Sequence, residues 1–160
     1  MSAVTSQQTQ EARRPKGTPG ALSRWIQRRA NVSTAKKIRR KGGQMMGMDL
    51  LVLHTVGRRT GEARENPLAW FDDGAGGRLV VASGGGSRHP GWFANLAAHP
   101  ERVAFEVHGS AVTPATAHVL DDAERARAWP AIAAAAPTID KHQRKSDRQY
   151  PVVRLVPAGA

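Results

Sequence analysis

Three arginines crowd a short stretch of the chain. Arg58, Arg59 and Arg64 lie within seven residues and are accompanied by Thr60 and Gly61. Guanidinium groups hold phosphate oxygens through paired hydrogen bonds, and turn glycines allow backbone N–H groups to face an anion. The stretch therefore predicts either a phosphate-binding turn or a basic hairpin tip that faces water.

A second stretch combines glycines with polar and aromatic side chains. Residues Ala82–Asn95 read Ala-Ser-Gly-Gly-Gly-Ser-Arg-His-Pro-Gly-Trp-Phe-Ala-Asn. A strand that ends in glycines before a helix begins places backbone donors where a ring or a phosphate can approach closely. Trp92 is suited to cover an aromatic ligand and Asn95 to bond one. The alternative is that Trp92 and Phe93 belong to the core and the glycines form an ordinary loop.

The charge of the chain is concentrated near its N-terminus. The net charge is +11, and residues 1–48 hold eleven of the 24 Lys and Arg but only one of the 13 Asp and Glu. The basicity therefore belongs to an N-terminal arm, and no nucleic-acid-reading motif accompanies it, so nucleic-acid binding is not favoured. There is no cysteine and no His-x-x-x-His spacing, so no metal site is predicted. A polar N-terminus without an apolar signal core fits a cytoplasmic protein.

Three regions follow from these patterns. Residues 1–20, rich in Ser, Thr, Gln, Pro and Gly, are expected to be disordered. Residues 21–44 are expected to form a basic amphipathic helix, and residues 45–160 a single domain. The helical segment 21–41 has four interpretations: peripheral contact with an anionic membrane surface, a cap on the barrel, an extension of the groove for the acidic tail of a ligand, or a solvated helix.

The domain is predicted to be mainly β. Apolar runs separated by turn residues predict strands at Leu50–Val56, Asn66–Phe71, Arg78–Ser83, Arg102–Val107, Ala111–Leu120 and Pro151–Val156. Helices are expected at 91–98, at Asp121–Ala136 with an interruption at Pro130, and at Ile139–Ser146. Sequential hairpins favour antiparallel pairing, so we expect an α+β fold built on a small barrel or rolled sheet.

The order of the motifs carries further information. Gly-Arg-x-Ser/Thr-Gly-x-x-Arg-x-x-Pro-Leu is followed by Ala-Ser-x-Gly-Gly, then by His-Pro-x-Trp-x-x-Asn-Leu, and finally by Gln143–Arg148 before the last strand. In this order and spacing, over roughly residues 45–157, the chain resembles the F420H2-dependent nitroreductase family of deazaflavin-dependent enzymes.

The resemblance implies a fold, a reaction and a set of site residues. It implies a split β-barrel related to flavin-binding oxidases, with reduced coenzyme F420 passing a hydride to a quinone, a nitro compound or another activated small-molecule acceptor. It places the arginines at the phosphate and acidic tail of the coenzyme, and later residues along and over the ring. The residues implied to bind the coenzyme are Arg58, Arg59, Thr60, Gly61, Arg64, Pro67, Leu68, Ala82, Ser83, Arg88, His89, Pro90, Trp92 and Asn95.

The acceptor side departs from the family pattern. Where relatives active on nitro compounds carry a tyrosine immediately before Gln143, this chain has His142. His142 is either a proton donor near neutral pH or a surface residue of a helix. The departure leaves two alternatives to the enzyme open, a deazaflavin-binding carrier protein and an FMN-binding barrel. Relatives of this barrel often dimerise, so a homodimer is an additional expectation.

Overall fold

The computed structural model describes residues 31, 33–40, 42–45, 47–84, 88–108 and 110–159. The segment expected to be disordered and most of the first half of the basic helix lie outside these residues. Residues 33–40 are helical. The remaining elements are β1 (Gln44–Met45), β2 (Met48–Val56), β3 (Ala63–Ala69), β4 (Phe71–Asp72), β5 (Arg78–Val81), α2 (Gly91–Ala98), β6 (Val103–Glu106), β7 (Thr113–Val119), α3 (Asp122–Ala135), α4 (Pro137–Lys145) and β8 (Val152–Pro157).

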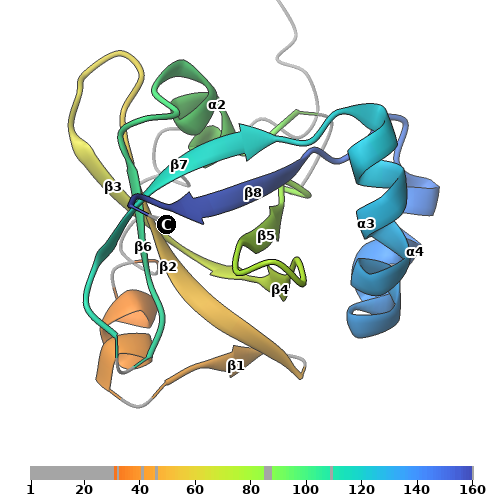
Figure 1. Ribbon diagram of the computed structural model, residues 1–160, viewed down its shortest axis with the longest axis horizontal. Coiled ribbons are helices and arrows are strands. Elements are labelled where there is room, and N and C mark those ends of the chain that lie inside the picture. Colours follow the sequence, from red (N-terminus) through yellow and green to blue (C-terminus); the bar gives the residue numbers. More distant parts are fainter. Residues whose placement is uncertain are drawn as a thin grey trace, which may run out of the picture.

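The strands form a single antiparallel sheet that curls into a barrel (Figure 1). Their order is β1-β2-β6-β7-β8-β5-β4, and β3 pairs with β2 on the side opposite β6. β4 follows β3 after Trp70 alone, so the chain itself connects the two ends of the sheet. The expected split β-barrel with antiparallel pairing is therefore confirmed.

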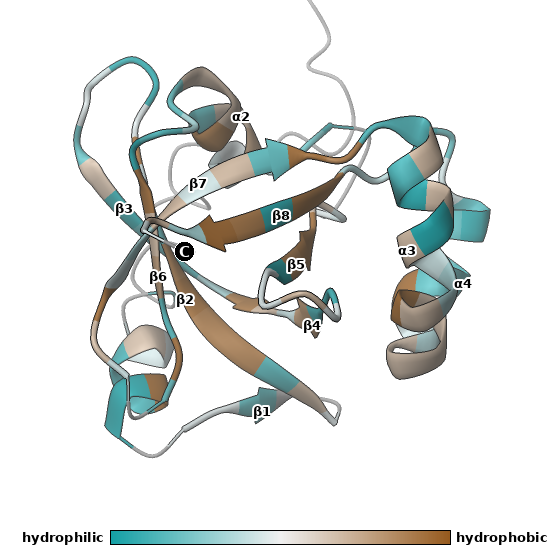
Figure 2. Ribbon diagram, viewed as in Figure 1, coloured by the Kyte–Doolittle hydropathy of each residue, from teal (hydrophilic) through white to brown (hydrophobic). Residues whose placement is uncertain are grey.

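Alternation along the strands divides the apolar side chains between the barrel interior and its outer faces. In β2, Leu51 and Leu53 belong to the interior cluster, whereas Leu50 and Val52 face outward. Figure 2 shows the resulting hydrophobic bands along β2 and β8. The buried interior residues are Leu51, Leu53, Val80, Ala82, Trp92, Leu96, Val103, Phe105, Ala115, Ala117, Val153 and Leu155.

The described part of the basic helix packs on the barrel. Ala35 and Ile38 are buried against Leu50 and Val52 on the outer face of β2. Over residues 33–40 the cap interpretation is therefore the one the structure supports. Across the described part of the chain, every helix is too short or too polar to cross a bilayer.

α3 departs from the expectation. It continues through Pro130 without the predicted interruption, although a proline removes one helical hydrogen bond. Contacts on both sides of the proline hold the helix: Ile132 is fully buried, and Trp129 Nε1 donates to Asp140 Oδ1 of α4 at 2.9 Å. α4 then begins at Pro137, a favoured first helical residue, rather than at Ile139.

The strand after the arginine-rich turn also differs from the expected Asn66–Phe71. β3 begins at Ala63, and Phe71 belongs to β4 rather than to the same strand. Arg64 pairs in register with Thr55 and Glu65 with His54. Backbone pairing extends the ladder through charged residues that an apolar pattern alone would exclude.

Candidate functional site

The arginine turn joins β2 to β3. Gly57 N–H donates to Glu62 O and Gly61 N–H to Gly57 O, both at 2.8 Å. Gly61 has a φ of +68°, which a residue with a Cβ adopts only with strain. Arg58 and Arg59 are exposed, and no carboxylate of the described residues pairs with either guanidinium. The turn therefore presents positive charge without an internal counter-charge.

Arg64 is held differently. It is half-buried on β3, and its Nη1 lies 2.9 Å from Glu62 Oε2. Glu62 is 64% exposed, so an anionic ligand could replace this carboxylate at little cost. The third arginine is thus available to a ligand only in competition with Glu62.

The turn is tied to α2. Arg58 N–H donates to Asn95 Oδ1 at 3.1 Å, across 37 residues of sequence. The bond brings the two sequence motifs to the same end of the barrel, where Figure 1 shows the β2–β3 loop beside α2. Asn95 therefore positions the turn through its oxygen.

Trp92 of α2 projects into the barrel interior. Its side chain is 7% exposed and belongs to the interior cluster, next to Phe93. The core alternative for Trp92 is thus the one the structure supports. Pro67 and Leu68 are consecutive in β3 and project to opposite faces, with Leu68 toward the interior. The side chains of this pair therefore do not share one ring-lining surface.

The end of β5 and the start of α2 meet at Arg148. Its guanidinium donates to the carbonyl oxygens of Ala82, at 3.1 Å, and Ser83, and lies 3.0 Å from His89 Nδ1. Burial, followed by the charge of Arg148, lowers the pKa of His89. Arg148 was not among the predicted site residues, although the Gln143–Arg148 motif pointed to this segment.

Three further predicted residues lie around this junction. Arg88 is exposed next to His89, and Pro90 is the N-cap residue of α2. His89 also contacts the Phe93 ring edge-on, with centroids 5.0 Å apart.

His142, the candidate proton donor, is exposed on α4.

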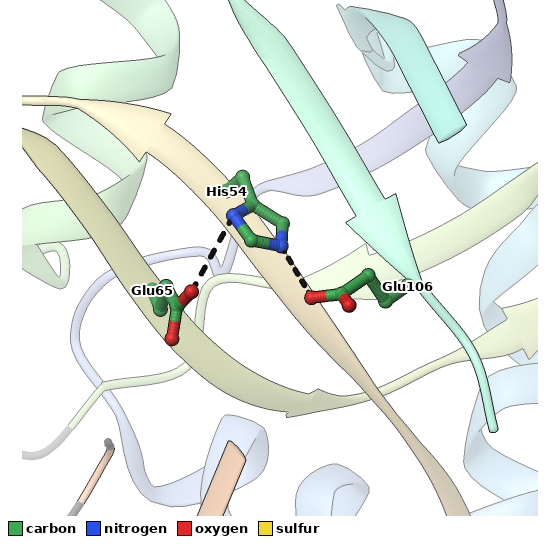
Figure 3. A group of neighbouring side chains, drawn as sticks. All are labelled: His54, Glu65 and Glu106. Carbon is green, nitrogen blue, oxygen red and sulfur yellow. Dashed lines mark hydrogen bonds and ion pairs between the residues drawn. The ribbon is translucent and has the colours of Figure 1, made fainter. Parts of the chain in front are cut away.

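A separate polar cluster lies on the outer face of the barrel (Figure 3). His54 of β2 points toward Glu65 of β3 and Glu106 of β6, with His54 Nε2 2.5 Å from Glu106 Oε2 and Nδ1 3.8 Å from Glu65 Oε1. One nitrogen and two carboxylate oxygens within 4.8 Å of one another could hold a metal ion. Sequence spacing did not reveal this group because its members come from three strands.

Arg39 already neutralises the two carboxylates. Its Nη2 lies 2.6 Å from Glu106 Oε2 and 2.7 Å from Glu65 Oε1, and its Nε bonds Glu106 at 3.0 Å. The hydrogen bond from Arg39 is the main reason that the pKa of Glu106 is lowered, and the same bond raises the pKa of Arg39. The cluster therefore fastens the helix over 33–40 to the barrel.

A cleft of about 710 Å³ separates α3 from the barrel. It is lined by apolar residues such as Leu79 and Ile132 and by charged ones such as Asp73 and Arg154. Asp73 and Arg154 form an ion pair at 3.1 Å. The cleft reaches Met48 at the start of β2, whereas the arginine turn follows the end of that strand. It is therefore distinct from the site around Arg58.

Known proteins resemble this chain in sequence and in fold. Residues 25–157 match the family described as F420H2-dependent quinone reductase. An F420H2-dependent quinone reductase of Mycobacterium tuberculosis is 30% identical over 147 residues, covering 84% of this chain and 97% of the relative.

Two solved structures resemble the chain. An F420-H2 dependent reductase, FDR-A, is 32% identical with a TM-score of 0.59, over 71% of this chain and 99% of that one. A structure described as a domain-swapped dimer is 24% identical with a TM-score of 0.60, over 84% of this chain and 99% of that one. The second likeness supports the fold alone.

Proposed function

The chain belongs to the family of F420H2-dependent quinone reductases, and on that premise we propose that it transfers a hydride from the reduced deazaflavin coenzyme to a quinone. A single observation supports a particular location for the coenzyme: the Arg58–Asn95 bond joins the two coenzyme motifs at one end of the barrel. The resemblance of the sequence motifs to those of deazaflavin-dependent enzymes agrees with the family match.

The described residues suit a polyanionic coenzyme. The tail of the deazaflavin coenzyme carries a phosphodiester and glutamates, and the exposed Arg58 and Arg59 offer unpaired positive charge to it. Arg64 adds a third guanidinium once Glu62 is displaced. These residues would hold the tail, and the Gly61 turn would keep their backbone close to the phosphate.

The ring is proposed to lie against the end of β5. When bound, the reduced coenzyme supplies the hydride. Ala82 is fully buried and Ser83 half-buried, and both backbone oxygens are turned toward Arg148. Trp92 of α2 is buried in the barrel interior and helps to exclude water from it. The protein's contribution is thus to bind, orient and partly desolvate the reacting pair.

Finer points extend the proposal. Nitro compounds are proposed as alternative acceptors, although His142 occupies the position at which relatives active on nitro compounds carry a tyrosine. We also propose a cytoplasmic location, with the part of residues 21–41 that precedes the packed helix over 33–40 as the segment that would touch an anionic membrane, and a homodimer as the assembly to test. None of these points is needed for hydride transfer.

Anaerobic mixing of the protein with reduced coenzyme F420 and menadione tests the function. We expect reoxidation of the coenzyme, followed by the return of its fluorescence, at a rate proportional to protein concentration and saturable in both substrates. Tight binding of the reduced coenzyme with reoxidation at the buffer rate would instead assign the chain to the carrier class for that acceptor. The matched control for substitutions in the β2–β3 turn is Arg144→Ala, because Arg144 is exposed on α4 and far from that turn in sequence.

A further inference from the structure

Arg148 lies where three segments of the chain meet. Its Nη1 donates to Ala82 O at 3.1 Å and its Nη2 to Ser83 O, both just past the end of β5. The same Nη1 is 3.0 Å from His89 Nδ1, two residues before α2 begins. A guanidinium has donors only, so Nδ1 accepts and His89 is held as the neutral ring. One side chain therefore connects the end of β5 to the start of α2.

The position of Arg148 is itself fixed by the segment after α4. Gln143 Nε2 donates to Arg148 O at 2.9 Å, and Gln143 Oε1 accepts from Tyr150 N–H at 2.7 Å and from Arg125 Nη2 at 3.0 Å. The Arg148 guanidinium also lies over the Tyr150 ring, 4.8 Å from its centroid. Gln143 and Tyr150 thus fix the position of Arg148, whereas Arg144 of the same motif faces outward.

Gly84, which follows Ser83, leaves little room for a side chain at this junction. Gly84 has a φ of +55°, and a Cβ there would approach Pro90 Cδ to 3.2 Å and Arg148 Nη2 to 3.4 Å. The backbone at Gly84 is therefore packed against both Arg148 and Pro90, the N-cap residue of α2. Arg148 forms no ion pair with a carboxylate of the described residues, and its buried Nε has no partner among them. Arg148 is half-buried and its charge is held by neutral groups alone, so the charge stays available to an anionic ligand, which indicates a role beyond stability.

We propose that Arg148 is a positioning residue for the coenzyme: it locks Ala82 and Ser83, at the end of β5, to His89, at the start of α2. This inference rests on the proposed function. Because α2 also holds Arg58 through Asn95, the contacts run continuously from Arg148 to the arginine turn. Arg148 acts through these groups, and its unpaired charge adds to the positive field that favours an anionic coenzyme.

Substitutions at Arg148 separate the charge from the geometry. Arg148→Gln removes both, and Arg148→Lys keeps the charge but loses the planar group that reaches two carbonyls at once. Coenzyme F420 is titrated by fluorescence, and kcat is measured with menadione per coenzyme bound. We expect Arg148→Gln to raise the Kd for the coenzyme roughly ten- to a hundredfold, from the charge-assisted hydrogen bonds that are lost. Arg148→Lys should recover part of the affinity, while kcat per bound coenzyme stays low.

The matched control is Arg144→Gln, since Arg144 is 79% exposed on α4 and its partner is Asp140. A folded Arg148→Gln protein with Kd and kcat within twofold of this control would overturn the proposal. A purely structural role would lower the fraction of folded protein but leave kcat per bound coenzyme unchanged, which would also overturn it.

Two further results keep the test decisive. Should Arg148→Gln not fold, Arg148→Lys decides by the same comparison, and Gly84→Ala should reproduce the loss because it displaces the same carbonyls with Arg148 present. If the unaltered protein neither binds F420 nor reduces menadione, the proposed function fails. If the unaltered protein does both and the Arg148 variants match the control, only the role of Arg148 fails.

Discussion

Arg58 and Arg59 are two residues whose charge the described fold leaves without a carboxylate partner. Their exposure alone would also suit a solvated turn. What distinguishes them is that the backbone of Arg58 is anchored to Asn95, which fixes the direction of the turn relative to α2. At this scale the site consists of fixed backbone and free guanidinium groups, an arrangement suited to a flexible anionic tail.

Replacing Arg58 or Arg59 by Ala should weaken coenzyme binding by roughly 1.5 to 3 kcal/mol if each loses a charge-assisted hydrogen bond. The thermal midpoint of the apoprotein should stay unchanged because neither side chain pairs with a described carboxylate. Fluorescence titration at two ionic strengths measures the effect, and the loss should shrink at high salt. Dissociation constants equal to that of Arg144→Ala would remove the arginines from the site.

His142 is the residue for which sequence and structure leave the smallest role. Reduction of a quinone consumes one hydride and one proton, and an exposed His142 on α4 leaves water able to deliver that proton. His142→Ala should therefore retain at least about half of kcat at pH 7, with the same pH profile. A loss of about a hundredfold or more, accompanied by the disappearance of one limb of that profile, would instead make His142 the proton donor.

At the scale of elements, the outer face of β2 decides what the basic helix does. Arg39 reaches across to Glu65 and Glu106, and His54 closes the group from β2 (Figure 3). The ion pairs and the buried Ile38 together hold residues 33–40 on the barrel. The arm is therefore attached at its C-terminal end whatever its preceding residues contact.

Glu106→Gln tests this attachment. The pKa of Glu106 is held below its ordinary value of 4.5, so the charged form stabilises the fold above that pH and the contribution is lost as pH falls through the folded-state pKa. The variant should lose about 1 to 2 kcal/mol of unfolding free energy at pH 7, a charge-assisted bond being partly screened by solvent.

Urea unfolding at pH 7 and pH 3 measures the difference. The gap between the two proteins should narrow at the lower pH, because below pH 4.5 the unfolded chain binds a proton at Glu106 more readily than the folded chain does. Glu62→Gln is the matched control, because Glu62 is 64% exposed and should change stability little. A gap that stays constant with pH would show that the Arg39 ion pair does not stabilise the fold.

What sequence could predict at this scale depended on how local the cause was. α2 matched its expected bounds because its glycine-rich lead-in and apolar spacing are local. The interruption predicted at Pro130 was wrong because tertiary packing holds α3 together, through the buried Ile132 and the Trp129–Asp140 bond. The Arg148 junction could not be derived from spacing, since 65 residues separate Arg148 from Ser83.

At the scale of the whole molecule, curling of the sheet is what assembles the site. The turn after β2, the end of β5 and the start of α2 are far apart in sequence and meet at one end of the barrel (Figure 1). The motif order predicted the barrel and this meeting. It did not decide between a buried and a ligand-covering Trp92, because that depends on tertiary packing. The resemblance placed Pro67 and Leu68 together along the ring, whereas alternation in β3 directs their side chains to opposite faces.

The central claim is that this end of the barrel binds a deazaflavin coenzyme. One protein preparation titrated separately with F420 and with FMN, each followed by fluorescence, tests it most directly. We predict saturable binding of F420 that weakens in Arg58→Ala and persists in Arg144→Ala, with FMN binding much more weakly. Tight FMN binding with no response to F420 would contradict the claim and assign the chain to the FMN-binding barrels.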